Sequence, residues 1–434
     1  MKLTPLDPWI SRKIAAGESQ LTRQELEAWQ LLKLNETLAL ARSKSPFYRN
    51  LFAAKPDSIT SLIDLRQFPF TTPDDIRRNP LQFVCVSQGE IQRVVTLQSS
   101  GTTGEPKRIY FTADDQELTI DFFGVGMSTL VQPGERVLIL LPGETSGSVG
   151  DLLRIGLKRL GMQPIPYGPV RHPLHALEAM QNQRVDCLVA SPTQALGLAR
   201  RWQPPMHKPH SVLLSTDYVP QSIVKALEQI WGCQVYNHYG ATEMGLGGGV
   251  ECAAHRGYHL READLYFEVV NPHTGETVQD GEFGEVVFST LSRRGMPLIR
   301  YRMGDRSRFI PRDCPCGTKL RTLDVVSGRF SGFVTVGDGV LSLPDFDEAL
   351  FSIPGLLNYS LTMTGEGADV TLIIETQMLT DADATRWVEQ ALLSIESIKD
   401  LKVTIICRYN PGETGNLLKR VISDQRSRDA QVLS

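Results

Sequence analysis

Short apolar runs alternate with amphipathic stretches through the middle of the chain, and this alternation restricts the possible folds more than any other feature of the sequence. Three aliphatic runs predict strands that are buried on both faces, at residues 136–141, 185–190 and 212–214. Helical periodicity between and after these runs predicts helices at residues 151–160, 175–183, 192–202 and 221–230. Strands and helices that alternate in this way build βαβ units around a parallel sheet. The sequence therefore predicts an α/β fold.

The beginning of the chain has a different texture from the middle. About the first 90 residues, 1–90, have mostly helical patterns. A helix expected over residues 21–41 begins with Thr22 and Glu25, which match the capping-box pattern that starts many helices. We therefore expect a helical lead-in before the first strand.

The later part of the chain predicts antiparallel pairing and then a second domain. Runs at residues 266–270 and 283–290 flank a turn-rich segment and predict a hairpin. After them the pattern predicts helices at 344–351 and 381–398 and strands at 357–363, 370–375 and 401–408. We expect a large N-terminal domain of mixed and parallel sheets with helices over residues 1–327, and a small α+β domain over residues 328–434.

Composition excludes several classes of protein. The chain has 434 residues, with 45 Lys and Arg against 49 Asp and Glu, for a net charge of −4. This balance lacks the basic footprint of a nucleic-acid or membrane-surface protein, so we expect neither partner. Apolar runs are too short to span a bilayer, the N-terminus has no signal-peptide pattern, and seven cysteines are an odd number for a disulfide framework. We expect a cytoplasmic protein.

A glycine- and hydroxyl-rich segment runs from Ser99 to Lys107 and is the sharpest motif in the sequence. Its polar residues are Ser99, Ser100, Gly101, Thr102, Thr103, Gly104 and Lys107. Backbone N–H groups and hydroxyls in such a loop surround phosphate oxygens, and the lysine adds a positive charge. The loop lacks the Gly-Lys-Ser/Thr ending of a Walker motif. The alternative is a polar turn between two strands.

Two further stretches carry side chains suited to a nucleotide. The first contains His238, Tyr239, Gly240, Thr242 and Glu243 after an expected strand. A ring stacks on adenine, a hydroxyl donates to phosphate, and a carboxylate binds magnesium.

The second stretch, residues 298–305, is expected to end a strand with Asp305, whose carboxylate can accept both ribose hydroxyls. Taken singly, either stretch also fits a strand end with a solvated charge.

In this order the three stretches resemble the adenylate-forming superfamily of acyl-CoA synthetases, and within it the phenylacetate–CoA ligase branch. The N-terminal passages at residues 45–48 and 65–71 are also similar to that branch. The resemblance implies a small mobile C-terminal domain, the use of ATP with magnesium, and two half-reactions. A carboxylate attacks the α-phosphate to give an acyl adenylate and pyrophosphate, and the thiol of coenzyme A then displaces AMP.

The resemblance also implies the roles of individual residues. Nucleotide contacts fall on the loop residues Ser99 to Gly104 and on Lys107, His238, Tyr239, Gly240, Thr242, Asp305 and Arg329, and catalytic roles on Lys107, Thr242, Glu243 and Lys419.

Two departures from the family pattern are visible. Residues 215–217 differ from the Gly-Glu sequence that usually lines adenine. Asn416 stands where the adenylation lysine is expected, so Lys419 or Arg420 takes that role, or both are surface charges.

Cysteine and histidine spacing predicts a second metal site. Cys252 and His255 follow the Glu243 stretch, and Cys314 and Cys316 follow Asp305. Three thiolates and one imidazole form a closed tetrahedral set, which is typical of structural zinc.

Alternatives to this zinc site remain open. His259 is the substitute ligand if His255 points away. An iron–sulfur cluster and unconnected buried cysteines are the other interpretations.

These observations predict an ATP-dependent, AMP-forming acid–CoA ligase for an aryl or arylacetic acid. Its cofactors and partners are ATP, Mg²⁺, coenzyme A, structural Zn²⁺ and a small organic acid, and it is a possible homodimer. Apolar candidates for the acyl pocket are Phe122, Phe123, Met127 and Met244. The alternatives are an adenylating transferase to a carrier protein or amine, and a nucleotide-binding homologue with weakened ligase activity because of Asn416.

Overall fold

The computed structural model describes residues 2–14, 21–97, 105–336, 339–365, 370–379, 383–399, 401–409 and 422–425. The chain divides into two compact units. Unit 1 comprises residues 1–133, 143–162 and 236–326, and unit 2 comprises residues 134–142, 163–235 and 327–434. The last segment of unit 2 begins beside the boundary expected from the sequence, but the division into domains 1–327 and 328–434 itself stays a prediction.

Unit 1 begins with the helical lead-in that the sequence predicts. Its helices are α1 (Leu6–Lys13), α2 (Arg23–Lys44), α3 (Pro46–Leu51) and α4 (Pro73–Arg78), with a 3₁₀ segment at Leu62–Gln67 between the last two. The capping box at the start of α2 is confirmed, because Thr22 accepts from the backbone of Glu25 and the Glu25 side chain accepts from Thr22. The helix buries Leu26, Leu34 and Leu38 on one face.

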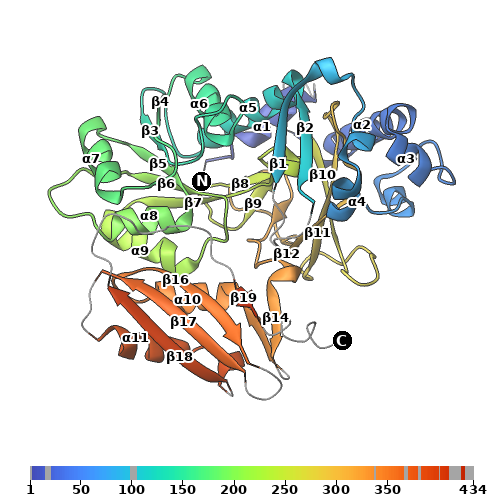
Figure 1. Ribbon diagram of the computed structural model, residues 1–434. Helices are drawn as coiled ribbons and strands as arrows, with labels where there is room; N and C mark the ends of the chain where they lie inside the picture. The colour runs from blue at the N-terminus through green and yellow to red at the C-terminus, as the bar shows by residue number, and fades with distance from the viewer. Residues whose placement is uncertain are drawn as a thin grey trace. The chain divides into compact units, whose positions relative to one another are not determined.

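Antiparallel strands make up most of the rest of unit 1. They are the pair β1 (Ile91–Leu97) and β2 (Lys107–Thr112), the sheet β10 (Leu265–Val270), β11 (Gly284–Thr290) and β12 (Tyr301–Ser307), and the series β7 (Gln234–Tyr239), β8 (Gly249–Glu251), β9 (Tyr258–Leu260) and β13 (Thr322–Leu323). The predicted hairpin is confirmed as β10 and β11, with Val269 opposite Val286. Figure 1 shows these strands in cyan, yellow and gold.

Two helices of unit 1, α5 (Ala113–Met127) and α6 (Val149–Arg159), pack closely against each other. Glycines at the crossing permit the approach, since a Cβ on Gly156 would lie 2.6 Å from the carbonyl oxygen of Ile120.

Unit 2 contains the parallel sheet that the alternating pattern predicts. Its strands β4 (Gln163–Pro166), β3 (Arg136–Ile139), β5 (Cys187–Ala190) and β6 (Ser211–Leu214) lie in this order and are all parallel. Its helices are α7 (Pro173–Gln183), α8 (Pro192–Ala199) and α9 (Gln221–Trp231). The α/β fold is therefore confirmed.

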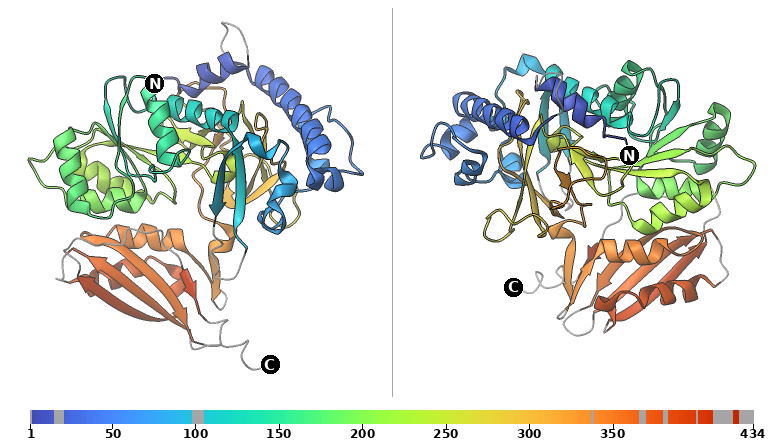
Figure 2. Two further views of the ribbon diagram at one scale, coloured as in Figure 1. Left: turned by 45° about the horizontal axis from the view of Figure 1, so that its top comes forward. Right: turned by 180° about the vertical axis from the view of Figure 1, so that it is seen from behind.

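The last part of unit 2 has a small α+β architecture. Its elements are β14 (Phe333–Val336), β15 (Gly339–Ser342), α10 (Leu343–Phe351), β16 (Leu356–Thr364), β17 (Thr371–Met378), α11 (Ala384–Leu392), β18 (Lys402–Tyr409) and β19 (Ile422–Asp424). The sheet order is β18-β17-β16-β19, and the right-hand view of Figure 2 shows α10 and α11 on one face of it.

One predicted helix of this region, at residues 381–398, is shorter than expected. It ends at Leu392, and a separate 3₁₀ turn spans Glu396–Ile398.

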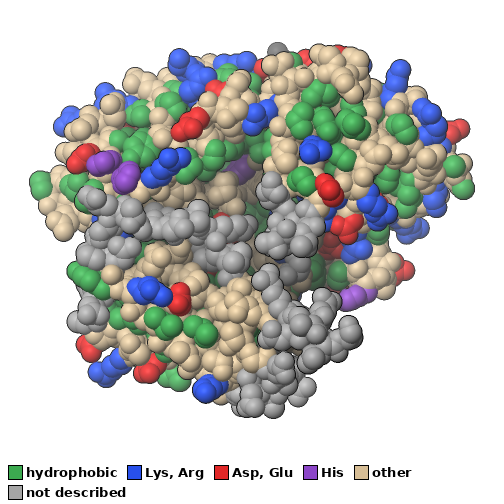
Figure 3. Space-filling model, in the orientation of Figure 1, with side chains coloured by type: hydrophobic (Ala, Val, Ile, Leu, Met, Phe, Trp, Pro, Cys, Tyr) green, Lys and Arg blue, Asp and Glu red, His purple; other side chains and the backbone are tan. Residues whose placement is uncertain are grey.

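Surface and helix properties agree with the composition. Lys and Arg side chains are interspersed with Asp and Glu side chains on the face that Figure 3 shows. In the described part of the chain, each helix is too short or too polar to cross a membrane.

Candidate active site

Two sequence motifs of unit 1 meet through a buried ion pair. Lys107 opens β2, directly after the glycine-rich loop, and its Nζ contacts Oε1 of Glu243. The two side chains are only 11% and 8% exposed. Tyr301 completes the group, because its hydroxyl lies 3.1 Å from Nζ of Lys107 and 3.3 Å from Oε1 of Glu243. The structure therefore brings a cation, an anion and a hydroxyl from three distant segments together.

The turn that carries Glu243 is fastened by a buried arginine. Thr242 opens this turn, a 3₁₀ segment over Thr242–Met244. Arg293 donates to the backbone oxygen of Glu243 at 2.8 Å and to that of Tyr110 in β2 at 3.0 Å. Burial of the guanidinium lowers the pKa of Arg293 to about 10. Arg293 thus connects the two backbone segments that present Lys107 and Glu243.

The expected ribose ligand lies in a second buried contact. The Tyr239 hydroxyl donates to Oδ2 of Asp305 at 2.9 Å. The Tyr239 ring stacks on Tyr258 with 5.5 Å between ring centroids, so one of its faces is covered. Asp305 was expected at a strand end, but it lies inside β12, at an irregularity in the pairing with β11 between the Arg302 and Arg306 positions.

Gly240, two residues before Thr242, allows a close turn of the backbone. A Cβ on Gly240 would lie 2.3 Å from the carbonyl oxygen of Leu246, so this close turn excludes any side chain.

An aromatic enclosure surrounds His238, next to Tyr239. The ring centroids of Phe122 and Phe123 lie 6.1 and 6.0 Å from that of His238. Nε2 of His238 is shielded from solvent, and burial lowers the pKa of His238 to about 4. The imidazole is therefore neutral at neutral pH.

The predicted cysteines converge on a histidine in unit 1. One ligand atom from each of Cys252, His259, Cys314 and Cys316 lies within 4.8 Å of the others, and all four residues are buried. The Sγ atoms of Cys252 and Cys314 are 3.6 Å apart, and Sγ of Cys316 lies 3.4 Å from Nε2 of His259.

Second contacts set the orientation and charge of this cluster. Nδ1 of His259 lies 3.4 Å from the Thr322 hydroxyl, which orients the ring so that Nε2 faces the thiols. Burial favours the neutral thiol of Cys316, but the hydrogen bonds with His259, the Thr318 backbone and Cys314, together with the charge of His259, outweigh it and lower the pKa of Cys316 to about 6.

His255, the first-choice ligand from the spacing, is not in the cluster, and this expectation is wrong. Its backbone has φ 48° in a turn after Cys252, and its Nδ1 lies 3.5 Å from Glu251. The substitute, His259, takes the place because β9 pairs with β8 and sets His259 opposite Val250.

A network of hydrogen bonds ties the loop of Cys314 and Cys316 to the N-terminal helix. Oδ2 of Asp7 in α1 accepts from the Thr318 hydroxyl at 2.7 Å and from the backbone N–H of Lys319 at 3.3 Å.

Other expected site residues lie elsewhere. Ser99, Ser100, Gly101, Thr102, Thr103, Gly104 and Lys419 lie outside the described residues. Arg329 is exposed and belongs to unit 2. In the stretch expected near adenine, Thr216 has φ 74°, a conformation that normally requires glycine.

Sequence reasoning missed two residues of the site, Tyr301 and Arg293. Tyr301 lies in the stretch that pointed to Asp305, so its phenol was an available signal. Arg293 gave no signal, because arginine is rarely expected to be buried.

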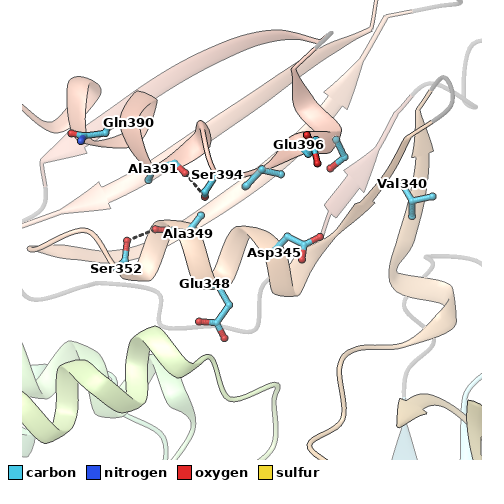
Figure 4. A pocket seen from close by; sticks show the side chains of 11 residues that line it. Val340, Asp345, Glu348, Ala349, Ser352, Gln390, Ala391, Ser394 and Glu396 are labelled. Carbon is cyan, nitrogen blue, oxygen red and sulfur yellow. Dashed lines mark hydrogen bonds between the residues drawn. The ribbon is translucent and has the colours of Figure 1, made fainter. Parts of the chain in front are cut away.

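A pocket of about 700 Å³ in unit 2 contains none of the expected site residues. Figure 4 shows it between α10 and α11, with Asp345, Glu348 and Glu396 among its lining residues. The carboxylate of Glu348 points away from it and accepts from Tyr218, Gln221 and Ser222. Ser352 and Ser394 are turned to their own helices, where they donate to Ala349 and Ala391.

Comparisons with known proteins agree with the geometry. The family described as AMP-binding enzyme matches residues 52–292, more than half of the chain. A phenylacetate-coenzyme A ligase of Aromatoleum evansii is 30% identical over 403 residues, covering 88% of this chain and 89% of the relative. A phenylacetate-coenzyme A ligase of Thermus thermophilus is 30% identical over 368 residues, covering 80% of this chain and 80% of the relative.

A solved structure has the same fold. It is 2-hydroxyisobutyryl-CoA ligase in the postadenylation state with 2-HIB-AMP, and it superposes with a TM-score of 0.82 at 20% identity, covering 95% of this chain and 92% of that one.

The chain therefore belongs to the AMP-binding enzymes. Within this family it belongs to the phenylacetate–CoA ligase-like branch, so it is an AMP-forming acid–CoA ligase that works through an acyl adenylate.

Proposed function

We propose that this ligase activates an aryl or arylacetic acid, with the Lys107–Glu243 pair at the centre of the adenylation site. The observation that carries the proposal is the convergence of these two buried, oppositely charged groups from separate motifs. Activation of a carboxylate spreads negative charge over the phosphates, and fixed positive charge lowers the barrier to that step. Lys107 supplies positive charge itself, and Glu243 supplies it through the metal ion that it would hold.

Each residue has a defined part in this proposal. Glu243 holds Mg²⁺, which neutralises phosphate charge when it is bound. Lys107 and Thr242 bind phosphate oxygens, together with the loop from Ser99 to Gly104. Asp305, oriented by the Tyr239 hydroxyl, accepts from the ribose. Arg329 binds the nucleotide, and Lys419 supplies the charge that Asn416 lacks.

The aromatic enclosure around His238 supports an aromatic acid as the substrate. Phe122 and Phe123 present ring faces and edges that pack well against an aryl group. Space beside them depends on Gly247, since a Cβ there would lie 2.4 Å from Phe122. The buried Met127 and Met244 supply further apolar surface.

The cysteine–histidine cluster fits structural zinc. Four ligands at Zn–S distances of about 2.3 Å have tetrahedral edges of about 3.8 Å, and shorter edges to nitrogen. The 3.6 and 3.4 Å separations are close to these values. Three thiolates and an imidazole leave no open position for a substrate, which supports a structural role.

Cellular context is part of the proposal. A homodimer and a cytoplasmic location remain predictions, and the net charge of −4 supports the absence of a nucleic-acid partner. Light scattering of the purified protein tests the dimer.

Pyrophosphate release tests the function. The protein is incubated with ATP, Mg²⁺ and either aryl acids, such as phenylacetate and benzoate, or aliphatic acids of similar size. We expect release with an aryl acid before coenzyme A is added, and thioester with AMP afterwards. Glu243→Gln keeps the shape of the side chain and should lower release by about a hundredfold or more. Release with aliphatic acids alone would contradict the proposed substrate class.

A further inference from the structure

We propose that the ammonium of Lys107 is a placeholder for Mg²⁺ on Glu243 in the nucleotide-free enzyme, and that Tyr301 is the positioning residue that keeps Glu243 in place while the two cations exchange. The inference rests on the proposed ATP and magnesium site. It adds an order of events and a residue with no assigned role.

The ion pair between Lys107 and Glu243 uses the carboxylate oxygen of Glu243 that would bind Mg²⁺. Nζ of Lys107 contacts Oε1 of Glu243, and both side chains are almost fully buried. A divalent cation and an ammonium at the same carboxylate oxygen repel each other, and the repulsion is strong where little water screens it. Magnesium therefore binds Glu243 only after Lys107 has moved away.

A triphosphate provides the reason for Lys107 to move. A buried ammonium that leaves its carboxylate needs another anion, because an unpaired buried charge is costly. Phosphate oxygens satisfy Lys107 and bring Mg²⁺ with them, so the nucleotide first draws Lys107 away and then delivers the metal to Glu243. The free enzyme should accordingly bind a divalent cation poorly at Glu243 and bind it well with ATP.

Tyr301 is built to stay fixed during this exchange. Its side chain is 1% exposed, its ring centroid lies 5.6 Å from that of Phe288, and its backbone pairs with Phe288 in β11 and bridges to Thr71. The hydroxyl accepts from Lys107 and donates to Glu243. When Lys107 leaves, the donation to Glu243 remains and keeps the carboxylate aimed at the metal.

The first experiment uses Mn²⁺ as the probe and the full chain loaded with zinc, without nucleotide. Electron paramagnetic resonance measures bound Mn²⁺ in wild type, in Lys107→Met, and in Lys107→Met with Glu243→Gln. We expect Lys107→Met to bind Mn²⁺ about tenfold more tightly than wild type or more, and the double variant to lose this gain. Equal affinity in wild type and Lys107→Met, or a gain that survives Glu243→Gln, overturns the proposal.

The second experiment isolates Tyr301. Tyr301→Phe removes only the hydroxyl, and we expect the ATP and Mg²⁺ concentrations for half-maximal pyrophosphate release to rise about tenfold, with kcat changed much less. Tyr48→Phe is the matched control, because Tyr48 is also fully buried and its hydroxyl also has two partners, Thr71 and the N–H of Ile299. It should leave both concentrations unchanged.

The outcomes separate this inference from the proposed function. If the wild type releases pyrophosphate and Tyr301→Phe has the same half-maximal concentrations, the positioning role is refuted and the proposed function stands. No release by wild type with any acid refutes the function. If Tyr301→Phe does not fold, the Mn²⁺ measurements still decide whether Lys107 is the placeholder.

Discussion

Replacing Cys314 by serine removes one ligand from the cysteine–histidine cluster and tests the zinc proposal directly. A serine hydroxyl stays protonated at neutral pH and is a poor ligand for zinc. We expect about one zinc per chain in wild type and less than about a tenth in Cys314→Ser, measured by elemental analysis after dialysis.

The expected loss of stability follows from linkage. At free zinc a thousandfold above its dissociation constant, the bound metal stabilises the fold by about 4 kcal/mol. Cys314→Ser should forfeit this amount in denaturant unfolding with zinc present. In the folded variant, we also expect α1 to detach more often, because Thr318 and Lys319 in the same loop hold Asp7 of α1. Trypsin should therefore cleave the variant faster at Arg12 and Lys13, the last residues of α1.

Cys85→Ser is the matched control for this prediction. Cys85 is a buried thiol of unit 1 outside the cluster, and its Sγ donates to Phe83. Cys85→Ser should retain its zinc, and trypsin should cleave it at α1 no faster than it cleaves wild type. A full zinc equivalent in Cys314→Ser, or equal zinc loss in both variants, would refute the reasoning.

Three other predictions concern the nucleotide and the pH dependence of stability. Asp305→Asn should raise the KM for ATP about tenfold or more in the pyrophosphate assay, since the ribose loses a charged acceptor; an unchanged KM would exclude that contact. Lys419→Ala should lower adenylation about a hundredfold, whereas Lys399→Ala, at a surface lysine paired with Glu396, should not. Burial lowers the pKa of His238 to about 4 from 6.5, so protonation favours the unfolded chain. The stabilising contribution of neutral His238 is complete above pH 6.5 and is lost as the pH falls toward 4. Over that interval the free energy of unfolding should fall by about 3 kcal/mol more in wild type than in His238→Asn. Parallel curves of unfolding free energy against pH for the two proteins would contradict this.

Local signals predicted most of the fold. The capping residues of α2, the aliphatic runs of the parallel sheet and the turn between β10 and β11 depend on neighbours in the sequence, and all three are confirmed. The helix expected at 381–398 ran six residues past the observed end at Leu392, because the apolar pattern continues through Leu393 and Ile395 although the last turn is 3₁₀.

Site residues that stand in contiguous sequence motifs were predictable, and residues whose position depends on strand pairing were not. Lys107 and Glu243 each stand in a recognisable stretch, and the structure brings them together. The choice between His255 and His259 depends on the register of β8 and β9, which spacing does not reveal. The role of Arg293 could not be predicted for a similar reason, because its two backbone partners are far from it in the sequence.

The contact between Asp7 and Thr318 has a consequence for how the chain assembles during synthesis. These residues are 311 positions apart, so a ribosome that adds 5–20 residues each second needs roughly 15–60 s to make the second after the first. An eight-residue helix does not hold together alone in water, so α1 depends on later segments, first on Asp121 and Phe122 of α5 and then on Thr318. The contacts of α1 are thus complete only after the cysteine loop has been translated.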